Sequence, residues 1–397
     1  MSLFDEALVE IDKGYRGEAV RIPTGFNKLD DILSIGQKMY TLVGGMSGTG
    51  KTSFVDQAYV LSPYAWYIAN KETSNIKLKI IYRSMERSKS YKIAKWITER
   101  IFVDKGLIVD VALVLGWHRK SKMSQETYDL VKTYRNYFEE MEDVVEIISG
   151  PENPTGIYNH AVKYAWATGT YFKAVAGEYV ESTKGDKIYF SDDIYRLDST
   201  GNKVFIVTVE AYGKRYELTP YSELYVPSSE DRIVELVTDH VGNLKKERRD
   251  NKVFTEKENL DKHSEYGRIL RDTYWMSPLN ISQFNRGLED TIRRTKTDLS
   301  PLPSDFKGSG NMYEDCDVAM GLFNPYKLKD FAHMGYKIDR FVTPKGENRF
   351  RSVTILKNSY GVDDVAYGYN FIGENGHFIE LPTAKEIGED YSPYLFD

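Results

Sequence analysis

The residues best suited to chemistry in this sequence are the eight from Gly45 to Thr52, GMSGTGKT. They follow an apolar run, 39–43, and precede a stretch that suits a helix, 53–61, so they predict a loop joining a strand to a helix. Glycines let such a loop turn backbone N–H groups toward a phosphate, and the helix start adds partial positive charge. The residues expected to line the phosphates are Gly45, Met46, Ser47, Gly48, Thr49, Gly50, Lys51 and Thr52. The pattern predicts binding of a nucleoside triphosphate, with Lys51 on its β- and γ-phosphates and the Thr52 hydroxyl on Mg²⁺.

Three further polar residues stand where apolar strands are expected to end. Asp239 closes the run RIVELVTD, a pattern typical of a second carboxylate for Mg²⁺. Glu86 follows the apolar-rich stretch 77–82, where a carboxylate can orient an attacking water. Gln283 follows LNIS, where an amide can sense the γ-phosphate. Each residue alone is as compatible with a solvated strand end, but their order after the glycine loop favours one site.

Composition narrows the class of protein further. Of the 397 residues, 41% are hydrophobic and 28% are charged, as in ordinary globular proteins. The net charge of −6 gives no general attraction to nucleic acid or to an anionic membrane, so any contact with a polyanion needs a local basic patch. The only cysteine is Cys316, which excludes an internal disulfide and favours a reducing compartment. No apolar run approaches the length of a membrane span.

The remaining patterns indicate one α/β domain with a smaller insertion. Helices are expected over 2–13, 89–102 and 124–141, and strands over 77–82, 144–148, 233–238, 279–282 and 318–323. From 170 to 229, short β-type runs separated by turns such as DSTGN and YGKR predict an antiparallel insertion. We therefore expect an N-terminal helix or arm over 1–20, a mostly parallel sheet flanked by helices over 21–169 and 230–397, and a β-rich insertion over 170–229.

The ordered motifs resemble those of DnaB-type replicative DNA helicases, which belong to the RecA-like ATPases. The resemblance rests on GMSGTGKT, YRSME, the strand ending at Asp239, ISQFNR and DFKGSGNMYEDCDVAMGLF, and it covers 22–361. The glycine loop is shared by many ATPases, whereas SMER and the SQFNR to DVA block are distinctive. Within this family the chain resembles phage-encoded members, which often lack the N-terminal primase-interacting domain. The resemblance does not account for the insertion, for which partner docking or an inert elaboration is expected.

The resemblance implies a role for each polar residue of the site. Lys51 and Thr52 would hold phosphate and Mg²⁺, Glu86 would be the general base, Asp239 the second carboxylate for Mg²⁺, and Gln283 the sensor of the γ-phosphate. The segment after Gln283 would face the ring channel and bind single-stranded DNA. Its DNA-binding residues would be Arg293, Arg294, Lys296, Lys307, Gly308 and Gly310. Basic side chains and glycine N–H groups suit a phosphate backbone, although a solvated charge run is the alternative.

Two features leave alternatives open. A second basic cluster, LKKERRD over 244–250, is equally compatible with another channel loop or the start of a surface helix. The family carries a lysine and, two residues later, an arginine that both reach a neighbouring subunit's nucleotide; here Lys357 fits the lysine, but Ser359 replaces the arginine. Either Arg349 or Arg351 substitutes, or hydrolysis is weak, because such an arginine can be worth about 10³–10⁵ in turnover.

From the resemblance we expect a ring-forming, ATP-dependent DNA helicase that moves along single-stranded DNA during phage-type DNA replication. It implies ATP and Mg²⁺ as cofactors, single-stranded DNA and further copies of the chain as partners, and a hexamer as the ring. A primase or a loader is a further candidate partner, a membrane is not expected, and the cytoplasm of the host is the expected location. The alternatives are a RecA-like recombinase or signalling ATPase, and a nucleotide-binding scaffold with weak hydrolysis.

Overall fold

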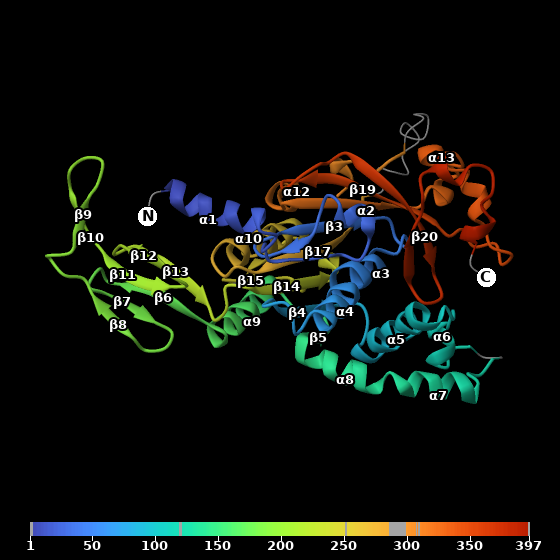
Figure 1. The fold of residues 1–397 in the computed structure, drawn as a ribbon, viewed down its shortest axis with the longest axis horizontal. Helices are drawn as coiled ribbons and strands as arrows, with labels where there is room; N and C mark the ends of the chain where they lie inside the picture. The colour runs from blue at the N-terminus through green and yellow to red at the C-terminus, as the bar shows by residue number, and fades with distance from the viewer. Residues whose placement is uncertain are drawn as a thin grey trace.

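The computed structural model has one large β-sheet at its centre (Figure 1). It describes residues 3–118, 121–250, 252–285, 299–306, 308 and 310–395. Within these residues the sheet has nine strands in the order β21-β20-β19-β18-β3-β17-β14-β4-β5. Their bounds are β3 (Thr41–Gly45), β4 (Lys77–Ser84), β5 (Val145–Ser149), β14 (Arg232–Asp239), β17 (Ser277–Gln283), β18 (Val318–Phe323), β19 (Phe350–Asn358), β20 (Val365–Ile372) and β21 (His377–Glu380). From β18 to β5 the strands are parallel, whereas β19, β20 and β21 add antiparallel pairs.

The parallel register brings several strand ends to the same edge of the sheet. Gly45 at the end of β3 lies opposite Gln283 at the end of β17. Asp239 at the end of β14 lies opposite Ser84 at the end of β4. Glu86 follows two residues after β4 ends. Because ligands of open α/β sheets bind beyond the carboxyl ends of parallel strands, this edge is where a site is expected.

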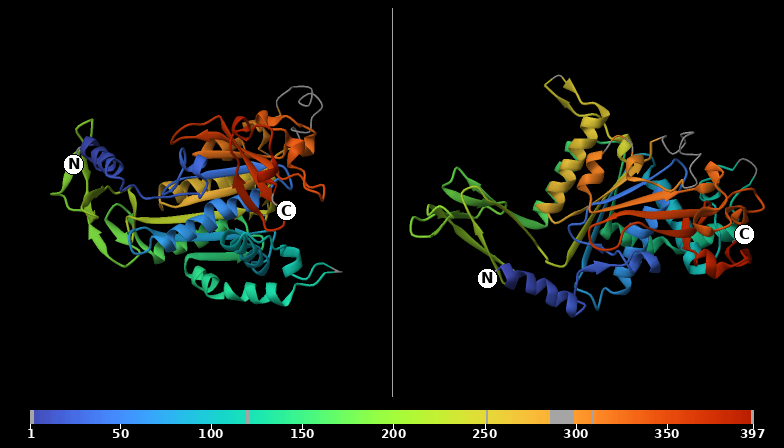
Figure 2. Two further views of the ribbon diagram at one scale, coloured as in Figure 1. Left: turned by 45° about the vertical axis from the view of Figure 1, so that its right-hand side comes forward. Right: turned by 90° about the horizontal axis from the view of Figure 1, so that it is seen from above.

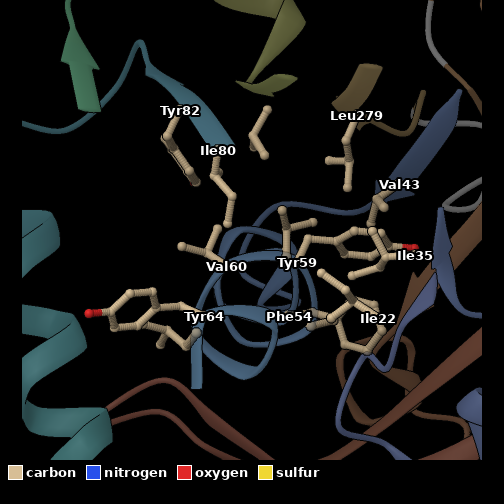
Figure 3. Packing of buried hydrophobic residues seen from close by; sticks show 14 of the residues in the cluster. Ile22, Ile35, Val43, Phe54, Tyr59, Val60, Tyr64, Ile80, Tyr82 and Leu279 are labelled. Carbon is tan, nitrogen blue, oxygen red and sulfur yellow. The ribbon is translucent and has the colours of Figure 1, made fainter. Parts of the chain in front are cut away.

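One face of the sheet is covered by the helix that follows the glycine loop. The elements on this face are α3 (Lys51–Asp56), the π-helical turn η1 (Gln57–Leu61), α4 (Ser62–Ala69), α5 (Lys89–Lys105) and α8 (Arg135–Val144). Figure 3 shows Val60 of this helix pointing toward Ile80, and Tyr59 toward Val43 and Leu279 of the strands. These side chains are fully or almost fully buried. Each such burial contributes about 1.5–3 kcal/mol, so the helix that carries Lys51 is firmly held against the sheet.

The opposite face is covered by α9 (Pro154–Ala167) and α10 (Glu256–Asp272). Ile81 lies in a separate buried cluster with Ala161 of α9 and Leu270 of α10, whereas its neighbour Ile80 faces α3. This alternation follows from the two-residue period of a strand. The molecule therefore has three layers, helix, sheet and helix, as the α/β prediction requires.

The predicted helices are found with one error. α1 (Leu3–Tyr15) and α5 occupy the two earlier predicted segments. The single helix predicted over 124–141 is wrong, because α7 (Gln125–Thr133) and α8 are separated at Tyr134, whose φ and ψ are −86° and 2°. The Tyr134 amide bonds to the carbonyl three residues back, which tightens the turn and ends α7. Every helix among the described residues is too short or too polar to cross a bilayer.

Small antiparallel sheets are inserted between α9 and β14, as predicted. A four-stranded sheet has the order β13-β6-β7-β8, and β9–β10 and β11–β12 form two separate hairpins. The strands are β6 (Gly169–Val175), β7 (Tyr179–Ser182), β8 (Lys187–Tyr189), β9 (Tyr195–Leu197), β10 (Lys203–Phe205), β11 (Val207–Ala211), β12 (Lys214–Leu218) and β13 (Glu223–Pro227). Figure 2 shows this insertion projecting away from the central sheet, beside α1. The division of the chain into domains at 20, 169 and 229 stays a prediction.

A buried histidine between α10 and β17 predicts acid sensitivity. The Nε2 atom of His263 lies 2.9 Å from Asn280 Oδ1, and Nδ1 has no hydrogen-bond partner among the residues that the structure describes. The Asn280 amide nitrogen donates to the Tyr40 hydroxyl, so Asn280 Oδ1 accepts from Nε2 and Nδ1 carries no proton in the neutral ring. Protonation would therefore bury a positive charge and add an N–H at Nδ1 with no acceptor among the described residues. Burial accordingly lowers the pKa of His263 to about 4.

We expect His263 to lower the free energy of unfolding as the pH falls. The unfolded chain takes up this proton below about pH 6.5, whereas the folded protein does so only near pH 4. Stability is therefore lost between these values, by about 2 kcal/mol from pH 7 to pH 5. Urea unfolding at the two pH values should show a smaller difference for His263→Gln than for the wild type. The exposed His118→Gln control should keep the wild-type difference, and an equally steep loss in His263→Gln would contradict the assignment.

Candidate nucleotide-binding site

The glycine loop has the predicted position between β3 and α3. Gly48 and Gly50 have φ values of 69° and 94°, a region that favours glycine. A Cβ at Gly50 would also lie 2.8 Å from the Phe378 ring. The Thr49 hydroxyl donates to the Met46 carbonyl at 2.9 Å, which closes the loop on itself. The backbone is thus fixed in a curled form that only glycine at these positions allows.

Lys51, the first residue of α3, is folded back over the loop. Its Nζ atom donates to the Met46 carbonyl at 2.9 Å. Burial lowers the pKa of Lys51 to about 8, Asp239 and Glu86 partly oppose this shift, and Lys327 adds to it. Within the part of the chain that the structure describes, the hydrogen-bond partner of this poorly solvated ammonium is a neutral carbonyl, and Asp239 and Glu86 offset the burial only in part. A phosphate in the loop would supply a counter-ion, so the residues fit a triphosphate.

Thr52 and Asp239 lie side by side at the strand edge. The Thr52 hydroxyl donates to Asp239 Oδ1 at 2.8 Å, and Asp239 is almost fully buried. A hydroxyl and a carboxylate oxygen are ligands that Mg²⁺ accepts in phosphate sites. The donor set therefore fits Mg²⁺ bound together with a triphosphate, as the sequence predicts.

Behind Asp239 is a buried charge network that sequence reasoning missed. The Lys92 Nζ atom lies 3.0 Å from both Asp239 Oδ2 and Asp56 Oδ1, and it also contacts the Tyr82 hydroxyl. The Tyr82 hydroxyl is 2.9 Å from Asp239 Oδ2 and 2.9 Å from Asp56 Oδ1. Lys95 is 3.2 Å from Asp56 Oδ2. Burial lowers the pKa of Lys92, but Asp239 and Asp56 outweigh it, so the pKa is raised and Lys92 stays charged.

Glu86 lies at the same edge and is held by two donors from the loop after β14. Its Oε1 atom is 2.8 Å from His240 Nε2 and 3.3 Å from the side-chain amide nitrogen, Nδ2, of Asn243. The Glu86 side chain remains 43% exposed, so its carboxylate can meet a water molecule. Gln283 is also exposed, at the end of β17 beside Gly45. The structure therefore gathers Lys51, Thr52, Glu86, Asp239 and Gln283 at one sheet edge.

A second lysine, also missed from the sequence, lies over the loop. The Lys327 Nζ atom donates to the Ser47 carbonyl at 2.9 Å and lies 2.7 Å from the position of a Cβ on Gly48. Burial and Arg351 lower the pKa of Lys327. Lys327 follows β18, and β18 ends next to β3. The position of Lys327 at the glycine loop could have been predicted only from this strand order.

Lys357 does not join the site within one chain. It lies on β19, which runs antiparallel to β18, and it pairs with Ala319 near the start of β18, at the edge opposite the glycine loop. Its Nζ atom donates to the carbonyls of Tyr313 and Glu314 at 3.1 and 2.8 Å. The proposed role on a neighbouring subunit's nucleotide stays a prediction.

The hypothesis that Arg349 or Arg351 reaches a neighbouring subunit is wrong. Both side chains are buried within their own chain. Arg349 is 3.1 Å from Glu374 Oε1, and Arg351 donates to the carbonyl of Thr49 at 3.2 Å. Arg351 therefore stabilises the backbone of the glycine loop in its own chain. Burial lowers the pKa of Arg351 to about 10. Sequence position alone did not show that both side chains, Arg349 just before β19 and Arg351 on it, are turned inward.

Most of the predicted DNA-binding residues, namely Arg293, Arg294, Lys296 and Lys307, lie outside the described residues. Of the other two, Gly308 has a φ of 70°, and Gly310 begins α12 (Gly310–Asp315). The roles of all six residues stay predictions.

The second basic cluster does not start a helix. β15 (Arg248–Arg249) and β16 (Lys252–Val253) pair as an antiparallel hairpin. The surface-helix alternative is therefore wrong. The hairpin, with residues 244–247 before it, presents exposed cations, namely Lys245, Lys246, Arg248 and Lys252. We name residues 244–250 together with 252–253 the basic hairpin.

Comparison with known proteins agrees with this architecture. The chain is similar to a solved ATPase domain, with a TM-score of 0.60 over 96% of this chain and 100% of that chain at 14% identity. It is also similar to a DnaB-like replicative helicase that was solved for its interactions with primase, with a TM-score of 0.59 over 96% of this chain and 67% of that chain at 14% identity. No protein-family model matches the chain, and no curated protein matches its sequence.

The fold is therefore the RecA-like α/β fold found in the ATPase domains of DnaB-type helicases, which confirms the predicted fold class. At 14% identity the likeness establishes the fold alone, so any inference about activity has to rest on the residues of the site.

Proposed function

We propose that this protein is an ATP-hydrolysing subunit of a ring-forming DNA helicase that translocates on single-stranded DNA during phage-type replication. One observation carries the proposal. A curled glycine loop with Lys51, a Thr52–Asp239 pair and an exposed carboxylate at Glu86 meet at one edge of a RecA-like sheet. These are the parts that binding and hydrolysis of a triphosphate require.

Each residue of the site has a distinct task in this proposal. The loop amides and Lys51 bind the phosphates, and the Lys51 charge offsets negative charge that develops on the transferred phosphoryl group. Glu86 accepts a proton from the attacking water, while its donors fix the direction of the carboxylate. Mg²⁺ bound at Thr52 and Asp239 would neutralise charge on the phosphate oxygens. Lys92 holds Asp239 in place from behind.

The partners follow from the same proposal. Lys357 lies at the sheet edge opposite its own glycine loop, which supports a role at the nucleotide of an adjacent copy in a ring, with six copies expected. Single-stranded DNA would pass the basic hairpin and the segment that includes Gly308 and Gly310. A primase or a loader is a further proposed partner, and the cytoplasm of a host cell is the proposed location.

Replacing Glu86 by glutamine tests the proposed base. We expect ATP turnover to fall by about 10²–10⁴-fold, because an amide cannot accept the proton from water. Binding of labelled ATP should be retained, since Glu86 lies outside the glycine loop and the amide oxygen can still accept from His240. A matched control is Glu126→Gln on α7, which is exposed. Turnover equal to that of the control would remove Glu86 from this role.

A second candidate function is a nucleotide-binding scaffold with weak hydrolysis. It is favoured by Ser359 in place of an arginine and by the burial of Arg349 and Arg351 in their own chain. ATP turnover with and without a single-stranded oligonucleotide separates the two. Stimulation by DNA, together with strand separation on a forked duplex, supports the helicase, whereas slow turnover that DNA does not change supports the scaffold.

A further inference from the structure

The loop after β14 connects the proposed base with the basic hairpin. It starts at His240, directly after Asp239, and contains the short 3₁₀ helix η2 (Val241–Asn243). His240 Nδ1 accepts a hydrogen bond from the Gly242 amide at 3.0 Å. In a neutral ring the hydrogen must then be on Nε2, which lies 2.8 Å from Glu86 Oε1. His240 is therefore oriented by its own loop to donate to Glu86.

Asn243 adds a second donor from the same turn. Its amide nitrogen donates to Glu86 Oε1 at 3.3 Å, and its backbone amide bonds to the His240 carbonyl at 3.0 Å. Both donors reach the same carboxylate oxygen. The direction of the Glu86 carboxylate is therefore set by the position of this one turn.

The turn leads without a break into the basic hairpin. Asn259, near the start of α10, donates to the Lys245 carbonyl at 3.0 Å and accepts from the Glu247 amide at 3.1 Å. The Lys245 amide bonds to the Glu152 carbonyl at 2.9 Å, and Glu247 Oε1 accepts from the Thr155 amide at 2.7 Å. These bonds tie residues 245–247 to α9, to α10 and to Glu152. The exposed Lys245 and Lys246 belong to this tied segment and lie two and three residues after Asn243, so a ligand that shifts the segment shifts Asn243 with it.

We propose that His240 and Asn243 are positioning residues that hold the Glu86 carboxylate through Oε1 and make its direction depend on what the basic hairpin binds. The partner implied by the exposed cations is the phosphate backbone of a single-stranded nucleic acid. Binding there would favour the loop position in which Glu86 faces the attacking water, which requires the nucleic acid to bind that position more tightly than the other. The inference rests on the proposed function and adds the residues that would link its two sites.

The test compares His240→Ala, His240→Gln and Asn243→Ala in the full chain, with ATP as substrate and a single-stranded oligonucleotide as activator. We expect His240→Ala to lower the maximal rate by about 10²-fold through misplacement of the base, with the KM for ATP and labelled-ATP binding unchanged. His240→Gln, whose amide can donate to Glu86, should recover most of the rate. Asn243→Ala should reduce the factor by which the oligonucleotide stimulates turnover. The control His118→Ala removes an exposed histidine–carboxylate pair and should change neither quantity.

A double-mutant cycle decides whether His240 acts through Glu86. In the Glu86→Gln background, His240→Ala should lower the rate no further. A further loss of the same size in that background would overturn the proposal, as would wild-type rates and stimulation in both His240→Ala and Asn243→Ala. Absence of ATP turnover in the wild type would overturn the proposed function and this inference together. Normal wild-type turnover with unaffected variants would overturn the inference alone.

Discussion

Replacing Lys51 by alanine should lower ATP turnover by at least about 10²–10³-fold, while leaving the fold at least as stable as before. The loss of turnover follows because Lys51 supplies the positive charge inside the loop. The effect on stability follows because burial lowers the pKa of Lys51 to about 8, so the folded protein holds a charge in an environment that disfavours it. Removing that charge should raise the free energy of unfolding at pH 7 by up to about 3 kcal/mol.

The pH dependence gives this prediction a second check. The folded pKa of Lys51 lies below the usual value of 10.5, so the unfolded chain binds more protons between about pH 8 and pH 10.5. The stability of the wild type should therefore rise, relative to that of Lys51→Ala, as the pH increases through this window. Denaturant unfolding without nucleotide at pH 7 and pH 9.5, beside ATP turnover, measures both effects. The exposed Lys71→Ala control should match the wild type, and a Lys51→Ala variant with normal turnover would refute the site.

The glycine loop could be predicted because its structure is local. The backbone of residues 45–52 depends on glycine at Gly48 and Gly50 and on the helix that begins at Lys51, all within a few residues. The insertion was predictable for a similar reason, since short β-type runs and turn residues lie next to each other in sequence. Asp239 and Glu86 could be assigned to one site from their strand ends and their order after the glycine loop, but the side chains that hold them, Lys92 and His240, could not.

What the sequence did not reveal depends on which strands are neighbours. His240 and Glu86 are far apart in sequence and meet only because β14 pairs with β4. Lys327 reaches the loop only because β18 lies beside β3. From the sequence, Arg351 was a candidate substitute for the missing arginine, but in the structure its side chain points toward Thr49 of its own chain. Strand order and side-chain direction are long-range properties, and no motif encodes them.

The buried lysine behind Asp239 predicts the largest effect on stability. Lys92 is fully buried and lies between the carboxylates of Asp56 and Asp239. Lys92→Met keeps the unbranched apolar stem of the side chain but removes the ammonium, which leaves two buried carboxylates facing each other, with Lys95 close to Asp56. Breaking a buried ion pair in this way costs about 3–5 kcal/mol. Urea unfolding at pH 7 should show a loss of this size, whereas the exposed Lys89→Met on the same helix should stay within about 0.5 kcal/mol of the wild type.

The cause of that loss can be separated from a simple packing defect by pH and by a second substitution. In the wild type, burial opposes ionisation of Asp56, but Lys92 and Lys95 outweigh it and lower its pKa. Without Lys92, burial dominates and the pKa of Asp56 rises, so the variant takes up a proton on folding. Its deficit relative to the wild type should therefore shrink as the pH falls through that raised value. Asp56→Asn in the Lys92→Met background should also recover much of the loss at pH 7. A deficit that neither acid nor Asp56→Asn reduces would mean that Lys92 stabilises the fold by packing and not by charge.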